Sequence, residues 1–147
     1  MKAVVQRVKK ASVKIDSKTI ASINKGFLVL VGIYSNDSEV DVLKIAKKIL
    51  NLRIFNNNEH KINLNISNIK GKILLVSQFT LCADTKKGNR PSFKKAMEPD
   101  KAKYLFNSLK NELSAYITTQ SGKFGASMNV ELINDGPMTI ILDTNEQ

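Results

Sequence analysis

The sequence predicts one α/β domain with mixed sheets and with helices covering one face. Two observations indicate this class. Continuous apolar runs at residues 27–33 and 73–76 are typical of strands buried on both faces. Stretches after Ser38 and Pro99 repeat apolar residues at helical spacing. At 147 residues the chain can bury a proper core, so we expect residues 1–147 to form a single domain.

The first half predicts four elements. Partial alternation over residues 2–15 indicates one strand, or two with a break near residues 10–11. A turn at residues 16–18 lets residues 19–23 pair back as a hairpin, and a second turn leads into the strand at residues 27–33. Ser38 begins a helix with Asp41 as a capping-box partner. Its predicted apolar face is Val40, Leu43, Ala46, Ile49 and Leu50, and its predicted outward face is Lys44, Lys47 and Lys48.

The second half of the chain also predicts both strands and a helix. Residues 53–55 are a short strand candidate, and the only histidine, His60, lies in a polar loop where we expect it to be solvated. A helix begins at Pro99 with Asp100 at or near its cap. Residues 128–133 and 138–142 are two strands separated by residues 134–137. The expected apolar stripe of the helix is Ala102, Leu105, Phe106, Leu109, Leu113 and Tyr116.

Charge and cysteine content narrow the class of protein. A net charge of +10 and a pI near 9.7 favour a polyanionic partner such as nucleic acid, or else describe a merely soluble basic protein. The single cysteine, Cys82, excludes an intrachain disulfide and indicates the cytoplasm. No run approaches the ~20 apolar residues that cross a bilayer, so we expect no membrane partner.

Polar residues at the end of the strand at 73–76 are the candidate chemical groups. Ser77, Gln78 and Thr80 must either satisfy nearby backbone groups or take part in chemistry. One histidine and one cysteine leave no His-rich metal site and argue against a Ser–His–Asp triad, so we expect neither metal nor cofactor. What remains is positioned hydroxyls, backbone N–H donors and water, which can still hydrolyse an activated ester.

A basic loop follows this strand. Five cations in ten positions either contact phosphates or are simply solvated: Lys86, Lys87, Arg90, Lys94 and Lys95.

Two motifs resemble the signatures of D-aminoacyl-tRNA deacylases. They are residues 77–81 (Ser-Gln-Phe-Thr-Leu) and residues 134–139 (Asn-Asp-Gly-Pro-Met-Thr). Residues 1–8, 48–55, 88–93 and 122–126 also resemble the family, so the likeness covers the chain in the expected order. Met138, where the family usually has Val, and Cys82, often Tyr, depart from the pattern.

The resemblance implies a homodimer with a three-layer α/β/β fold, barrel-like sheets and active sites at the dimer interface. The Gly136–Pro137 bond would be cis and would reach into the partner's site, rejecting L-aminoacyl groups. Many D-amino acids, and glycine misattached to tRNA(Ala), would then be released from aminoacyl-tRNA. The 2′-OH of the terminal adenosine would supply the catalytic group that the chain lacks.

The resemblance also assigns roles by motif position. Ser77, Gln78, Phe79 and Thr80 would line the aminoacyl pocket at the tRNA 3′ end, with backbone N–H groups facing the ester carbonyl and Thr80 orienting water. Arg7 would brace the partner's Gly–Pro motif. The remaining substrate-binding positions are Phe124 and Met128 at the adenine, with Asn134, Met138 and Thr139.

Two rival interpretations remain at this point. An editing module of the same fold removes a wrong L-amino acid, but it is fused to a synthetase and lacks the Gly–Pro motif. A basic RNA-binding protein without activity would bind tRNA and leave the aminoacyl group in place.

Overall fold

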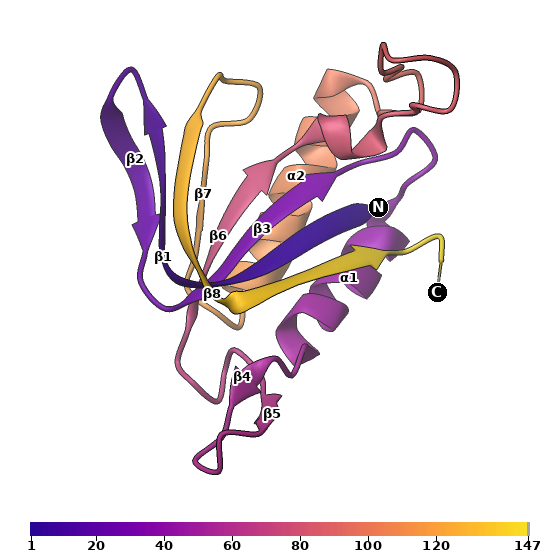
Figure 1. The fold of residues 1–147 in the computed structure, drawn as a ribbon. Coiled ribbons are helices and arrows are strands. Elements are labelled where there is room, and N and C mark those ends of the chain that lie inside the picture. Colours follow the sequence, from indigo (N-terminus) through magenta and orange to yellow (C-terminus); the bar gives the residue numbers. More distant parts are fainter. Residues whose placement is uncertain (147) are drawn as a thin grey trace.

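The computed structural model describes residues 1–146, and both helices lie on the same side of a curved sheet (Figure 1). No helix among these residues is long and apolar enough to cross a membrane. The elements are β1 (Lys2–Ile15), β2 (Lys18–Ile23), β3 (Gly26–Gly32), α1 (Glu39–Asn51), β4 (Phe55–Asn56), β5 (Ile62–Leu64), β6 (Lys72–Ser77), the 3-10 helix η1 (Phe79–Cys82), α2 (Pro99–Ser114), β7 (Thr119–Ser121) and β8 (Asn129–Asp143).

Strand β1 organises the main sheet. Its first half lies between β3 and β8 and its second half between β2 and β8, with all three neighbours antiparallel. Beyond β3 the sheet continues in parallel through β6 and β7. The backbone N–H of Ser22 in β2 donates to the Gln120 side chain in β7 at 2.9 Å. The sheet therefore curls into a nearly closed, barrel-like form, as expected.

Alternate residues of the central strands build two separate cores. On β3, Phe27, Val29 and Val31 pack against the helices, while Leu28 faces the opposite way. Leu28 joins a second cluster formed with the far half of β1, with β2 and with β6. The order of layers is therefore helices, sheet, sheet, which confirms the three-layer α/β/β class. Members of the second cluster are Val8, Ala11, Val13, Ala21, Ile23, Leu28, Leu74 and Val76.

Helix α1 begins as predicted but is rotated. Ser38 and Asp41 form the capping box, and the three lysines face solvent. The prediction that Val40 and Leu43 face the core is wrong, because their exposed fractions are 58% and 55%. The buried stripe with the i, i+3, i+4, i+7 spacing is Val42, Ile45, Ala46 and Ile49.

Helix α2 begins at Pro99, as predicted, and its cap lies two residues before Asp100. Glu98 is the N-cap and Pro99 occupies the first helical turn, where a missing N–H is tolerated. The predicted stripe is buried from Ala102 to Leu113. Tyr116 is the exception, with 68% exposure, because the helix ends at Ser114.

Strand β8 replaces the two strands predicted for residues 128–142. It runs along β1 with a large bulge: Thr139 pairs with Gln6 and Asn134 with Val8, so residues 135–138 oppose Arg7 alone. The short strands β5 and β7 were not predicted. His60 is exposed in its loop, as expected.

Candidate active site

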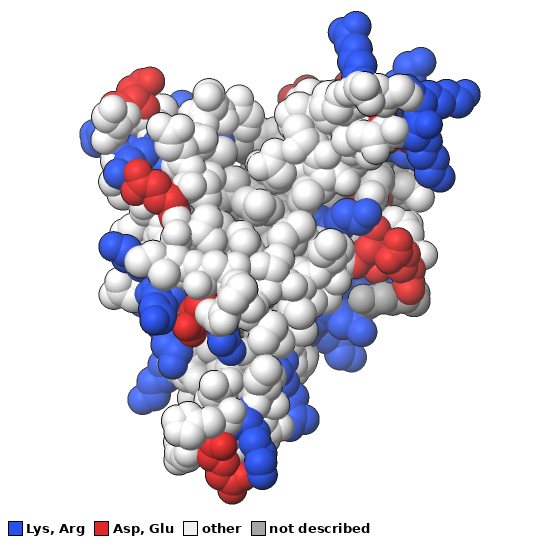
Figure 2. Space-filling view, viewed as in Figure 1, with Lys and Arg blue, Asp and Glu red and all other residues white. Residues whose placement is uncertain are grey.

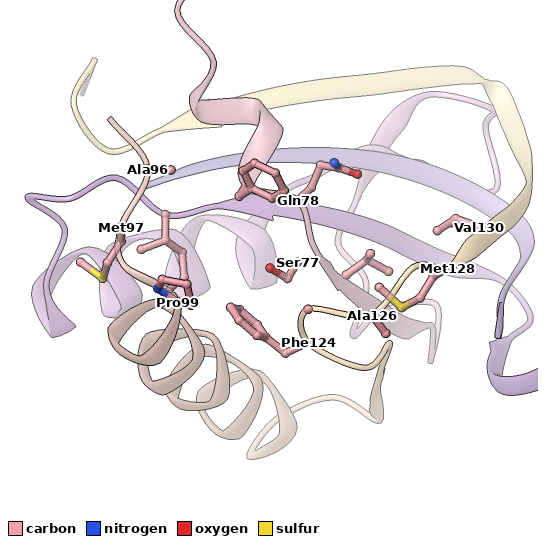
Figure 3. Close-up of a pocket in the computed structure, with 14 residues that line it drawn as sticks. Ser77, Gln78, Ala96, Met97, Pro99, Phe124, Ala126, Met128 and Val130 are labelled. Carbon is pink, nitrogen blue, oxygen red and sulfur yellow. The ribbon is translucent and has the colours of Figure 1, made fainter. Parts of the chain in front are cut away.

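A cavity of about 490 Å³ lies at the carboxyl end of β6 (Figure 3). The strand is buried through Val76, and Ser77 is half-buried where it enters the cavity. Three segments far apart in sequence meet here: the end of β6, the start of α2 and the loop before β8. The lining residues are Ile33, Val76, Ser77, Gln78, Phe79, Ala96, Met97, Pro99, Ala102, Phe124, Gly125, Ala126, Met128 and Val130.

The chain leaves the sheet at this cavity. The Gln78 N–H makes a last bond to the Val31 carbonyl oxygen at 2.8 Å, and the backbone then turns into η1. The first N–H groups of a helix have no intrahelical acceptor. Those of Phe79 and Thr80 also find no other acceptor within residues 1–146. Two adjacent backbone donors therefore remain available beside a cavity.

The side chains of the first motif divide between cavity and surface. Ser77, Gln78 and Phe79 line the cavity, and Thr80 does not. The Gln78 amide donates to the Thr80 hydroxyl oxygen at 2.5 Å on the exposed side of η1. Burial raises the pKa of the neighbouring Cys82 thiol to about 11, with the Asp37 charge adding to the effect. Cys82 is therefore a packed thiol and not a thiolate nucleophile.

The loop before β8 forms the facing wall. Phe124 and Met128 both line the cavity, with Phe124 below Ser77 and Met128 to the right in the view of Figure 3. The Phe124 ring packs at 5.7 Å, between centroids, on Phe106 of α2. A Cβ at Gly122 would lie only 2.7 Å from the Met128 sulfur, so a larger residue there would displace the Met128 side chain from this position.

The second motif is fixed by its own side chains. The Asn134 side-chain oxygen Oδ1 accepts from the Met138 backbone N–H at 2.8 Å, and the Asn134 side-chain Nδ2 donates to the Thr139 hydroxyl at 2.9 Å. The Gly136–Pro137 peptide bond is cis, and both residues are exposed. Asn134, Met138 and Thr139 therefore hold the bulge.

Arg7 anchors this bulge to the sheet. It is 8% exposed, and its Nε donates to the Asp135 carbonyl oxygen at 2.9 Å while Nη1 donates to the Ile54 carbonyl oxygen at 2.6 Å. We predicted that Arg7 braces the Gly–Pro motif of the partner. Within the described chain, Arg7 contacts the motif of its own chain. The reason is the bulge, which places residues 135–138 directly opposite Arg7.

The two motifs do not meet within one chain. None of the bulge residues lines the cavity, nor does Arg7. Strands β1 and β3 lie between this part of β8 and β6, so the separation spans three strand spacings, roughly 14 Å in a flat sheet.

The basic loop projects beside η1. Figure 2 shows Lys and Arg gathered at this corner of the molecule. Four of the five predicted cations form no ion pair within the described residues, and Lys95 pairs with Asp84 at 3.0 Å. Backbone bonding from Lys86, reinforced by Lys95, lowers the pKa of Asp84. Across residues 1–146 no three His, Cys, Asp or Glu side chains gather as metal ligands would.

Sequence reasoning missed the third wall of the cavity. Ala96, Met97, Pro99 and Ala102 are small or apolar, and nothing in their order distinguishes cavity lining from core. The helix start at Pro99 was the one available signal.

Comparison with known proteins identifies relatives over nearly the whole chain. A family model described as D-Tyr-tRNA(Tyr) deacylase matches residues 4–143. The solved structure of a c-Myc DNA unwinding element binding protein is 41% identical, with 98% of this chain and 99% of that chain covered and a TM-score of 0.94. A probable eukaryotic D-amino acid tRNA deacylase is 16% identical, with coverage of 96% and 97% and a TM-score of 0.82, a likeness of fold.

Proposed function

This chain belongs to the D-Tyr-tRNA(Tyr) deacylase family, ester hydrolases of D-aminoacyl-tRNA, and on that premise we propose that the cavity at the end of β6 is the site of hydrolysis. The aminoacyl group enters beside Ser77, and the terminal adenosine lies toward Phe124 and Met128. Water adds to the ester carbonyl carbon, and the bond to the ribose 3′ oxygen breaks. Free D-amino acid and tRNA are released.

Stabilisation of the oxyanion falls to the backbone. The N–H groups of Phe79 and Thr80 supply two donors without competing acceptors in residues 1–146. Preorganised donors of this kind each contribute roughly 10²–10³ in rate. The Gln78 amide holds the Thr80 hydroxyl, so Thr80 serves η1 geometry in addition to donating its N–H.

The observation that carries the mechanism is the composition of the cavity wall. None of its lining residues has an ionisable side chain, so the wall offers no carboxylate or imidazole as general base. The 2′-OH of the substrate's terminal ribose lies next to the ester and relays the proton, accepting one from the attacking water as it gives its own to the leaving 3′ oxygen.

A substrate lacking that hydroxyl tests the mechanism. D-tyrosyl-tRNA ending in 2′-deoxyadenosine is expected to react about 10²–10⁴-fold more slowly, which is the usual contribution of acid–base catalysis. The matched control is the binding constant of the same tRNA, which is expected to change little. Equal rates for the two substrates would refute substrate-assisted catalysis.

We further propose a homodimer in which the partner's bulge completes each cavity. Gly136 and Pro137 are exposed and do not line the cavity of their own chain. Figure 2 shows an area free of Lys, Arg, Asp and Glu between the hairpin of β1 and β2 and the corner that carries the basic loop. Strand β8 also exposes Leu132, Ile133 and Ile141 at 36%, 45% and 66%. An apolar exposed strand favours association with a second copy.

This arrangement explains the handedness of the substrate. A backbone wall next to the α-carbon excludes an L side chain by steric contact and by leaving polar groups unpaired. Selection by rejection admits many D side chains, and glycine as well, including glycine on tRNA(Ala). A reduced Cys82 is compatible with action in the cytoplasm.

Mixed dimers test the shared site. Ala126→Trp fills the cavity, and Gly136→Val disturbs the bulge because its Cβ would lie 2.9 Å from Arg7 Nη2. Each variant alone is expected to be inactive. Since half of randomly reassociated dimers are mixed and each mixed dimer has one intact site, about a quarter of wild-type activity is expected on mixing. No recovery on mixing would contradict a cross-subunit site.

A further inference from the structure

Two phenylalanines are exposed together at the mouth of the cavity. The exposed fractions are 56% for Phe79 and 39% for Phe93. Their ring centroids are 5.0 Å apart and their planes are inclined by 68°, so the edge of one ring meets the face of the other. Phe79 also lines the cavity, which places the pair at its rim.

The backbone holds Phe93 in this position. Ser92 exchanges two hydrogen bonds with Asp84, at 2.8 and 2.9 Å, immediately before Phe93. The Phe93 carbonyl oxygen then accepts from the Ala96 N–H at 2.9 Å. The backbone is therefore hydrogen-bonded both before and after Phe93, which holds this exposed ring in place. Most exposed loop residues lack such anchoring, so we interpret the ring as a preformed contact surface.

The charge around the pair selects a polyanion. Lys86, Lys87, Arg90 and Lys94 are exposed in the same loop and form no ion pair within residues 1–146. The carboxylate of Asp84, whose backbone bonds to Ser92 next to Phe93, is already paired with Lys95. Aromatic faces surrounded by free cations are the combination that binds single-stranded nucleic acid, by stacking bases and contacting phosphates.

We propose that Phe79 and Phe93 stack the base of the nucleotide preceding the terminal adenosine, with the basic loop contacting its phosphates. This proposal rests on the proposed function, because the cavity must hold the adenosine end for the next nucleotide to reach its rim. The pair thus distinguishes an RNA 3′ end from a free aminoacyl nucleoside. A second copy of the chain seated on Phe93 is the competing occupant.

Two substrates of different length test the proposal. Full-length D-tyrosyl-tRNA carries the preceding nucleotide, whereas 3′-O-D-tyrosyl-adenosine lacks it. Base–aromatic stacking is worth roughly 5- to 150-fold in affinity. Phe93→Ala is therefore expected to lower kcat/KM on the tRNA by about that factor more than on the adenosine ester. Phe93→Leu is expected to show the same selective loss, while Phe93→Tyr keeps the ring and stays near wild type.

Controls keep the outcome distinct from that of the proposed function. Hydrolysis of the adenosine ester by the wild-type protein depends on the cavity alone. Tyr116→Ala removes an aromatic side chain that is even more exposed, beyond the far end of α2, and is expected to leave the ratio between substrates unchanged. Inhibition by the trinucleotide cytidine-cytidine-adenosine, with no amino acid attached, can be compared with inhibition by adenosine. This comparison measures the contribution of the preceding nucleotide to binding alone, without the hydrolysis step.

The result that would overturn the proposal is a loss that is equal on both substrates, or absent on both. Equal loss together with dissociation of the dimer would assign Phe93 to a contact between copies of the chain.

Discussion

Replacing Arg7 tests how the sheet holds the Gly136–Pro137 bulge. The buried guanidinium donates to the carbonyl oxygens of Asp135 and Ile54. A hydrogen bond from a charged donor contributes about 1.5–3 kcal/mol, so complete removal costs about 3–6 kcal/mol. Because small domains have only ~5–15 kcal/mol of stability, Arg7→Ala is expected to unfold partly. Arg7→Lys keeps the charge and one bond, and should cost about half as much.

The assay for Arg7→Lys has two readouts. Urea unfolding gives the free energy from the midpoint and slope. Turnover of D- and L-tyrosyl-tRNA gives the selectivity. A displacement near 1 Å costs up to ~10²-fold in a positioned site, so we expect L-tyrosyl-tRNA hydrolysis to rise about tenfold or more.

Lys9→Gln, on an exposed position of β1, is the matched control and should stay within ~0.5 kcal/mol of wild type. Wild-type selectivity in a destabilised Arg7→Lys protein would refute the link between this anchor and chirality.

Two further predictions concern single groups. With a pKa of about 11, about one-thousandth of Cys82 is thiolate at pH 8, whereas a thiol with the ordinary pKa of 9.0 would be about one-tenth thiolate. Because the thiolate fraction increases with pH, iodoacetamide labelling of the native protein should be slow at pH 8 and should speed up toward pH 11. Fast labelling at pH 8 would contradict the burial of Cys82. Binding of tRNA should weaken with salt, and Lys86→Ala with Lys87→Ala should reduce the slope of log K against log salt by roughly 1.4, about 0.7 for each single-strand phosphate contact. An unchanged slope would remove these two lysines from the tRNA contact.

Much of the fold is readable from the sequence, since buried strands and capped helices have local signals. The apolar run of β3 and the Ser38 capping box each predicted their element correctly. The rotation of α1 was not predictable in this way, because Val40 and Val42 are equally apolar and only packing selects between them. Tyr116 was misassigned because an apolar stripe does not mark the end of its helix.

Some residues of the candidate site also have a local signal in the sequence, and others have none. Ser77 and Gln78 are conspicuous because polar groups end a buried strand. The wall from Ala96 to Ala102 is invisible in sequence because it consists of small or apolar residues. The pairing of Arg7 with its own chain's Asp135 depends on a bulge in β8, and such a register shift has no counterpart in the hydrophobic pattern.

The most direct measurement is the release of amino acid from D- and L-tyrosyl-tRNA by the purified protein under identical conditions. We expect rapid release from the D ester and negligible release from the L ester. Equal release from both, or binding of tRNA with neither ester cleaved, would contradict it.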